Sequence, residues 1–140
     1  MISTTLLMLT LAQGHLTSEQ QKTIQQIQDY TEANKALLYA ASFLINTRTK
    51  SDYCLEYFPK ADLSLKLANA KAKKWELAVS KRFVGTIAEV SLLILKKEIG
   101  KSVKSGFESK NYVAQDCDSL VDAITNKALP LDIEPYVTEK

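Results

Sequence analysis

Apolar side chains recur once per helical turn along residues 65–94, and this periodicity constrains the fold more than any other feature of the sequence. Gly85 interrupts the stretch. Glycine inside a helix costs about 1 kcal/mol relative to alanine, so we expect a kink or a split there. Residues 90–95 are apolar almost all round and are predicted to be the most buried turn of the domain. The residues of the apolar stripe are Leu65, Ala68, Ala72, Trp75, Val79, Phe83, Val90, Leu93 and Ile94.

Further helical signals lie on both sides of this stretch. A capping-box pattern begins at Thr17 or Ser18, each of which is followed three residues later by a glutamine. We expect the helix that starts there to fade over residues 46–50, where the chain is polar, and a short second segment to occupy residues 53–58. An apolar face at helical spacing predicts a last helix over residues 112–126.

The N-terminal segment, residues 1–16, contains no Asp, Glu, Lys or Arg and has an apolar run from Leu6 to Ala12. We predict a secretory leader here, although the lysine or arginine that usually precedes such a run is missing. The run is too short to span a membrane, which takes about 20 residues. The alternative is an apolar N-terminal helix that packs on the body of the domain.

The chain has two cysteines, Cys54 and Cys117, far apart and without CxxC spacing, so no zinc knuckle or thioredoxin-type motif is expected. In an oxidising compartment two such cysteines normally pair. The even count and the predicted leader together favour a disulfide. The alternative is two buried free thiols in a cytosolic protein.

These observations predict an all-α fold, a small bundle of three to four helices with one disulfide. The helical domain is expected to occupy residues 17–129. Pro130 and Pro135 interrupt regular structure beyond it, so residues 130–140 are expected to form an irregular, extended C-terminal tail.

Side chains suited to catalysis or metal binding are scarce. The one histidine, His15, lies within the predicted leader, so no Ser/His/Asp or Cys/His arrangement can be assembled on the domain. Asp116, Asp118 and Asp122 lack the order of an EF-hand loop and are interpreted as an acidic first helical turn. Glycine-rich phosphate-binding motifs are also missing from the sequence. We therefore expect a protein that is not an enzyme and uses neither a metal nor another cofactor.

Positive charge is concentrated in the middle of the chain. The net charge is +2, but residues 60–104 hold eleven basic and four acidic side chains, a net of +7. The low overall charge argues against a nucleic-acid partner, and an acidic protein surface is favoured over an anionic membrane. The plainest alternative is a solvated helix face that keeps the protein soluble. The candidate partner-binding residues are the basic Lys71, Lys74, Lys81 and Arg82 and the aromatic Tyr57.

The segment from Tyr53 to Pro59, with Cys54 in it, is followed by a Lys/Ala-rich helix containing Trp75 and by the late Cys117. This sparse pattern resembles a loose group of small secreted, all-helical, disulfide-linked periplasmic proteins of Gram-negative bacteria. The resemblance covers about residues 50–125 and implies a bridge between the two cysteines. Some proteins of this kind are immunity proteins, which neutralise toxins.

Two functions follow as hypotheses. The first is a non-enzymatic periplasmic or secreted module that binds another protein, in its concrete form an immunity or inhibitor protein acting on a toxin or an enzyme. The second is a cytoplasmic or membrane-peripheral module that binds polyanions through the lysine-rich helix face.

Overall fold

The computed structural model describes residues 16–58 and 63–138, and within them the chain forms five α-helices and no strand. The expected all-helical class is confirmed, but the helices number five rather than three to four. The predicted leader lies outside the described residues, apart from Leu16.

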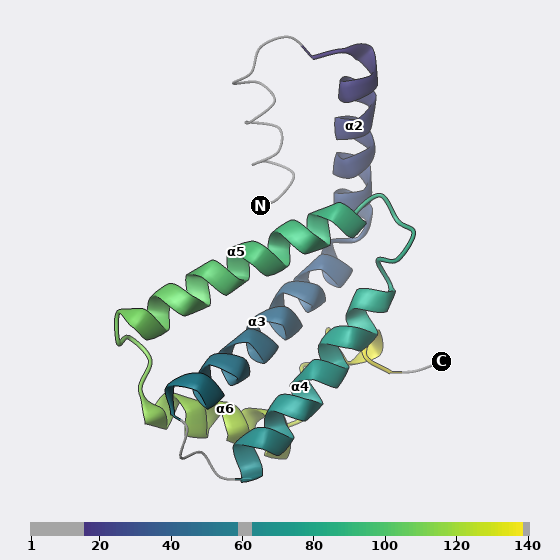
Figure 1. Ribbon diagram of the computed structural model, residues 1–140. Coiled ribbons are helices and arrows are strands. Elements are labelled where there is room, and N and C mark those ends of the chain that lie inside the picture. Colours follow the sequence, from purple (N-terminus) through teal and green to yellow (C-terminus); the bar gives the residue numbers. More distant parts are fainter. Residues whose placement is uncertain (1–15, 59–62, 139–140) are drawn as a thin grey trace.

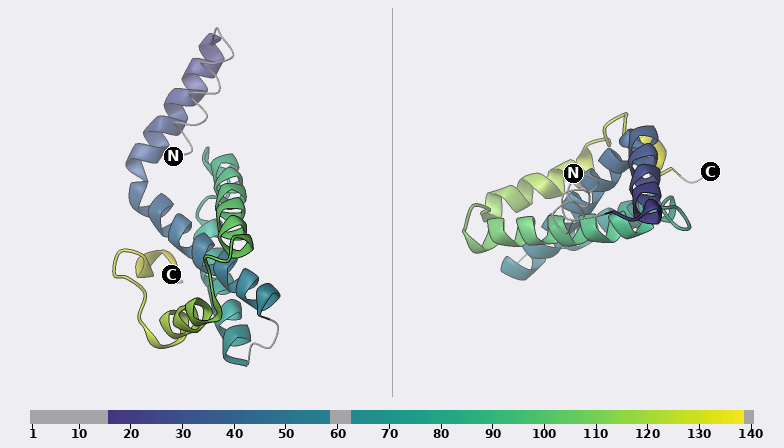
Figure 2. Two further views of the ribbon diagram at one scale, coloured as in Figure 1. Left: turned by 90° about the vertical axis from the view of Figure 1, so that its left-hand side faces the viewer. Right: turned by 90° about the horizontal axis from the view of Figure 1, so that it is seen from above.

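Helix α3 (Lys35–Tyr57) runs through the centre of the molecule (Figure 1). Helices α4 (Leu63–Lys81) and α5 (Glu89–Glu108) each pack against it along most of their length. Helix α6 (Ala114–Asn126) lies across α3 and α4 near the C-terminal end of α3. Helix α2 (Ser18–Ala33) extends away from the other four helices and buries no residue (Figure 2).

The beginning of α2 follows the capping-box prediction. The backbone N–H of Gln20 donates to Oγ1 of Thr17 at 3.1 Å, and the Thr17 N–H donates to Oε1 of Gln20 at 2.9 Å. The helix ends at Asn34, whose backbone leaves helical geometry at φ −123° and ψ 30°. The backbone N–H and the side-chain amide of Asn34 both donate to the carbonyl of Tyr30, each at 2.9 Å, so Asn34 caps the end of α2. This break adds one helix to the expected number.

The polar stretch at residues 46–50 does not end a helix, contrary to the expectation, because α3 continues through it to Tyr57. The hydroxyls of Thr47 and Thr49 donate to carbonyls one turn earlier, at 2.9 and 2.7 Å. Arg48 pairs with Asp52 four residues later at 2.8 Å. Thr47, Arg48 and Thr49 are thus satisfied within the helix or by α4, and the predicted short segment at 53–58 is, apart from the capping Phe58, the last part of α3.

The periodic stretch splits at Gly85, one of the two outcomes expected there. Gly85 has φ +77°, a conformation that glycine adopts without steric cost, and it lies in the irregular turns between α4 and α5. Residues 90–95 are not the most buried turn of the domain. Val90 is 66% exposed and Leu93 63% exposed, while Leu92 is buried. Because α5 packs mainly against α3, its opposite side faces solvent.

The largest cluster of buried residues joins α3, α4 and the start of α5, and it includes Leu44, Ile45, Val79 and Phe83. The C-terminal segment belongs to the same cluster through Ile133, which has no exposed area. The chain there forms a short 3₁₀ helix, η1 (Glu134–Tyr136), instead of the expected extended tail. Its prolines therefore accompany a tight turn packed on the core.

Candidate functional site

The three lysines predicted for partner binding lie on the exposed side of α4. Lys71, Lys74 and Lys81 are all exposed. The Lys71 ammonium lies 5.2 Å from the centre of the Trp75 ring, a cation–π contact. Within the described residues Lys74 and Lys81 form no ion pair, so their charges remain available to a partner.

The other two candidates lie elsewhere. The guanidinium of Arg82 donates to the carbonyl oxygens of Pro135 at 3.0 Å and Tyr136 at 3.2 Å, so Arg82 attaches the C-terminal segment to the end of α4. Tyr57 is at the end of α3, 39% exposed, and its ring centre lies 5.4 Å from that of Phe107. The three lysines thus lie together on α4, whereas the guanidinium of Arg82, next to Lys81, is engaged by the C-terminal segment and Tyr57 lies on α3.

The lysines share their side of α4 with apolar residues that the sequence analysis did not select. One line along the helix, which we call the outer stripe, consists of Leu63, Leu67, Ala70, Lys74, Leu77 and Lys81, all exposed. The three leucines are 68%, 61% and 58% exposed, large values for this side chain. The spacing alternates between four and three residues, the repeat by which two helices pack along a common line. This spacing can be seen in the sequence, and it could have predicted the outer stripe.

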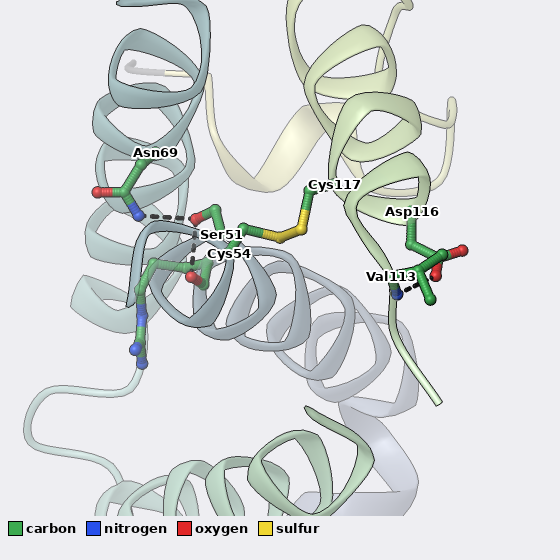
Figure 3. The surroundings of a disulfide bond; sticks show 7 residues. Ser51, Cys54, Asn69, Val113, Asp116 and Cys117 are labelled. Carbon is green, nitrogen blue, oxygen red and sulfur yellow. Dashed lines mark hydrogen bonds between the residues drawn. A yellow bond between two sulfur atoms is a disulfide. The ribbon is translucent and has the colours of Figure 1, made fainter. Parts of the chain in front are cut away.

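The inner side of α4 holds the helix firmly on the body of the protein. Leu65, Ala68, Ala72 and Val79 are buried. Asn69 is also buried, and its amide donates to the Ser51 hydroxyl at 2.7 Å and to Asp52 at 2.8 Å (Figure 3 shows the Ser51 contact). The outer stripe is therefore presented by a helix whose position is fixed by packing and by side-chain hydrogen bonds.

A charged cluster makes a second link between α3 and α4. Arg48 of α3 donates from Nε and Nη2 to the two carboxylate oxygens of Glu76 of α4, and from Nη1 to Asp52. The hydrogen bonds from Glu76, assisted by those from Asp52, raise the pKa of the Arg48 guanidinium above its ordinary value although burial opposes this. Lys96 of α5 lies 3.8 Å from Glu76. Because the guanidinium is occupied on two sides by carboxylates, the cluster supports the fold and is not a free binding group.

The expected disulfide is present between Cys54 of α3 and Cys117 of α6 (Figure 3). Both cysteines are buried. Asp116, next to Cys117, accepts a hydrogen bond from the backbone N–H of Val113 at 2.7 Å, as expected of an acidic residue in a first helical turn. In the described part of the chain, no group of three or more His, Cys, Asp or Glu side chains is arranged to hold a metal ion.

Over residues 16–58 and 63–138, no helix combines the length and the apolar character needed to cross a membrane. Comparisons with protein-family models, with curated proteins and with solved structures found no match.

Proposed function

We propose that the chain is a non-enzymatic protein-binding module, and that it binds an acidic amphipathic helix of its partner along the outer stripe of α4. The observation that carries this proposal is the line of leucines and unpaired lysines that α4 exposes to solvent. Fully burying a leucine side chain stabilises a complex by about 1.5–3 kcal/mol, so three exposed leucines in one line favour the binding of an apolar partner surface. Lys74 and Lys81 within the same line favour acidic side chains on the partner helix.

The support of α4 on its inner side favours the same function. A surface that is already held in its bound geometry loses less conformational entropy on association. The buried alanines of α4, the bond from Asn69 to Ser51 and the pair of Arg48 with Glu76 restrict the helix before any partner arrives. An inhibitor or immunity protein is the concrete form of the function that we propose, because such a protein gains affinity from a surface that is already ordered.

The proposed compartment is the periplasm or the extracellular space. The Cys54–Cys117 disulfide supports this location, because such bonds persist mainly in oxidising compartments. Intact-mass measurement of the protein from the cells that make it, with and without reductant, tests the location. Two free thiols in freshly alkylated protein would contradict it.

Site-specific photo-crosslinking in the producing cells tests the binding surface. A benzophenone amino acid at Ala70, within the outer stripe, is expected to form an adduct whose crosslinked peptide is an acidic amphipathic helix. The same group at Leu131, which is 87% exposed and remote from the stripe in sequence, serves as the control. An adduct of equal yield at both positions, or none at Ala70, would contradict the proposal.

Charge reversal separates this function from polyanion binding. K74E/K81E is expected to abolish the Ala70 adduct, whereas K97E/K101E, on an exposed side of α5, changes the charge equally and should leave the adduct intact. The purified protein is also titrated with duplex DNA and with vesicles containing anionic lipid. Salt-dependent binding to either one, lost in K74E/K81E, would favour the polyanion function instead.

A further inference from the structure

The side of α5 that faces away from α3 carries a second group of exposed apolar side chains, separate from the outer stripe. Val84, Val90 and Leu93 are each more than half exposed. In the right view of Figure 2, the first half of α5 runs along one edge of the molecule, where another molecule can approach it. The members of this group, which we call the α5 patch, are Val84, Ile87, Val90, Leu93 and Ile94. Clustered exposed apolar side chains of this kind mark sites of association.

Charged side chains of opposite sign lie at the two ends of the α5 patch. Glu89 is four residues before Leu93 and Lys97 is four residues after it, so the three lie along one line of the helix. Both charged residues are exposed. Glu89 accepts the backbone N–H of Gly85 at 3.3 Å, but neither Glu89 nor Lys97 forms an ion pair with a described residue. The line therefore runs from acidic through apolar to basic, with Leu93 at its centre.

This line is complementary to itself when its direction is reversed. If the α5 helices of two copies lie antiparallel with their Leu93 side chains in contact, Glu89 of each copy lies opposite Lys97 of the other. A parallel arrangement would instead place like charges together, which is unfavourable. Residues four apart form the ridges by which helices pack, and a two-fold axis makes each contact twice. The charge pattern therefore fits a second copy of the chain.

We propose that the protein forms a two-fold symmetric dimer in which the α5 patches of two copies pack antiparallel on each other. The dimer contact uses no residue of the outer stripe, so this inference is independent of the proposed function. The adduct at Ala70 is expected whether or not the dimer forms. Failure of either proposal therefore leaves the other standing.

Sedimentation velocity of the purified protein over a wide range of concentrations tests the dimer. The measured mass is expected to rise from that of the monomer to twice that value. L93D places two carboxylates at the centre of the contact and should weaken association by about 100-fold. L67D is the matched control, because Leu67 is similarly exposed but belongs to the outer stripe, and it should associate as the unmodified protein does. A monomer at every concentration, or equal weakening by L93D and L67D, would overturn the inference.

Exchange of the two charges tests the antiparallel arrangement. K97E and E89K should each weaken association by about tenfold, because each places like charges together at both ends of the contact. E89K/K97E restores opposite charges across the two-fold axis and should associate as the unmodified protein does. A double variant that associates no better than the single variants would contradict the arrangement.

Two controls complete the test. Circular dichroism establishes that each variant is folded, and if L93D fails to fold, the charge series still decides. Vesicles of anionic lipid test the other occupant that an exposed apolar patch can have. Vesicle binding by a protein that stays monomeric, lost in L93D, would assign the α5 patch to a membrane surface and overturn the dimer.

Discussion

Reduction of the Cys54–Cys117 bond should destabilise the protein by about 4 kcal/mol. The bond joins positions 63 residues apart, and the loop-closure entropy that it removes from the unfolded chain amounts to about 4 kcal/mol for a loop of that length. Native packing should change little, because both sulfur atoms stay buried between α3 and α6 when the bond opens. The loss is a large fraction of the 5–15 kcal/mol typical of a domain, yet small enough to leave most molecules folded.

Urea unfolding followed by circular dichroism, with and without a phosphine reductant, measures this loss. With a slope of about 2 kcal/mol per molar urea, the midpoint should fall by about 2 M. The helical signal without urea should stay the same. C54A/C117A is the control for the reductant and should show no response to it. A midpoint shift below about 0.5 M would refute the entropic reasoning, and a loss of helix without urea would show that the bond holds the native helices together directly.

Two further changes test packing and charge. G100A should stabilise the protein by about 1 kcal/mol, because nothing lies within 4 Å of the added Cβ inside α5. G106A should destabilise the protein instead, because its Cβ would lie 2.3 Å from Cε2 of Tyr112. Urea unfolding compares the two variants, and equal effects would be inconsistent with the close contact. E76L should cost about 3 kcal/mol by leaving Arg48 without its main partner, and R48M/E76L should recover most of this loss in the same assay. A double variant as unstable as E76L would contradict that reasoning.

The sequence was a sound guide where local chemistry decides the structure. The Thr17–Gln20 capping box lies entirely within one turn, so its residues alone predict the start of α2. Cys117 and Ile124, seven residues apart, share the buried face of α6, which lies within the helix predicted over residues 112–126. The pairing of Cys54 with Cys117 was favoured by the even cysteine count together with the predicted leader, and neither needs knowledge of how the helices pack.

Local sequence patterns gave wrong predictions where the structure depends on residues that are distant in the sequence. Residues 46–50 look like a helix end, because polar side chains are usually solvated. Arg48 remains in α3 with a partner, Glu76, 28 positions later. The predicted burial of residues 90–95 is wrong for a related reason. An apolar run does not show whether other helices cover all of its sides. In this fold α5 has α3 on one side, and Val90 and Leu93 face outward.

The outer stripe was missed because one helix carries two apolar lines. Leu65, Ala72 and Val79 form the inner line, and Leu67 and Leu77 belong to the outer one. A search for a single apolar side assigns the helix to the core and leaves the remaining side to solvated lysines. Folding requires the inner line, since burial of that line holds α4 on α3. It does not require the outer leucines, which remain exposed after the chain has folded. A function that covers them therefore explains their presence more directly than the stability of the monomer does, and this is why we place partner binding on α4.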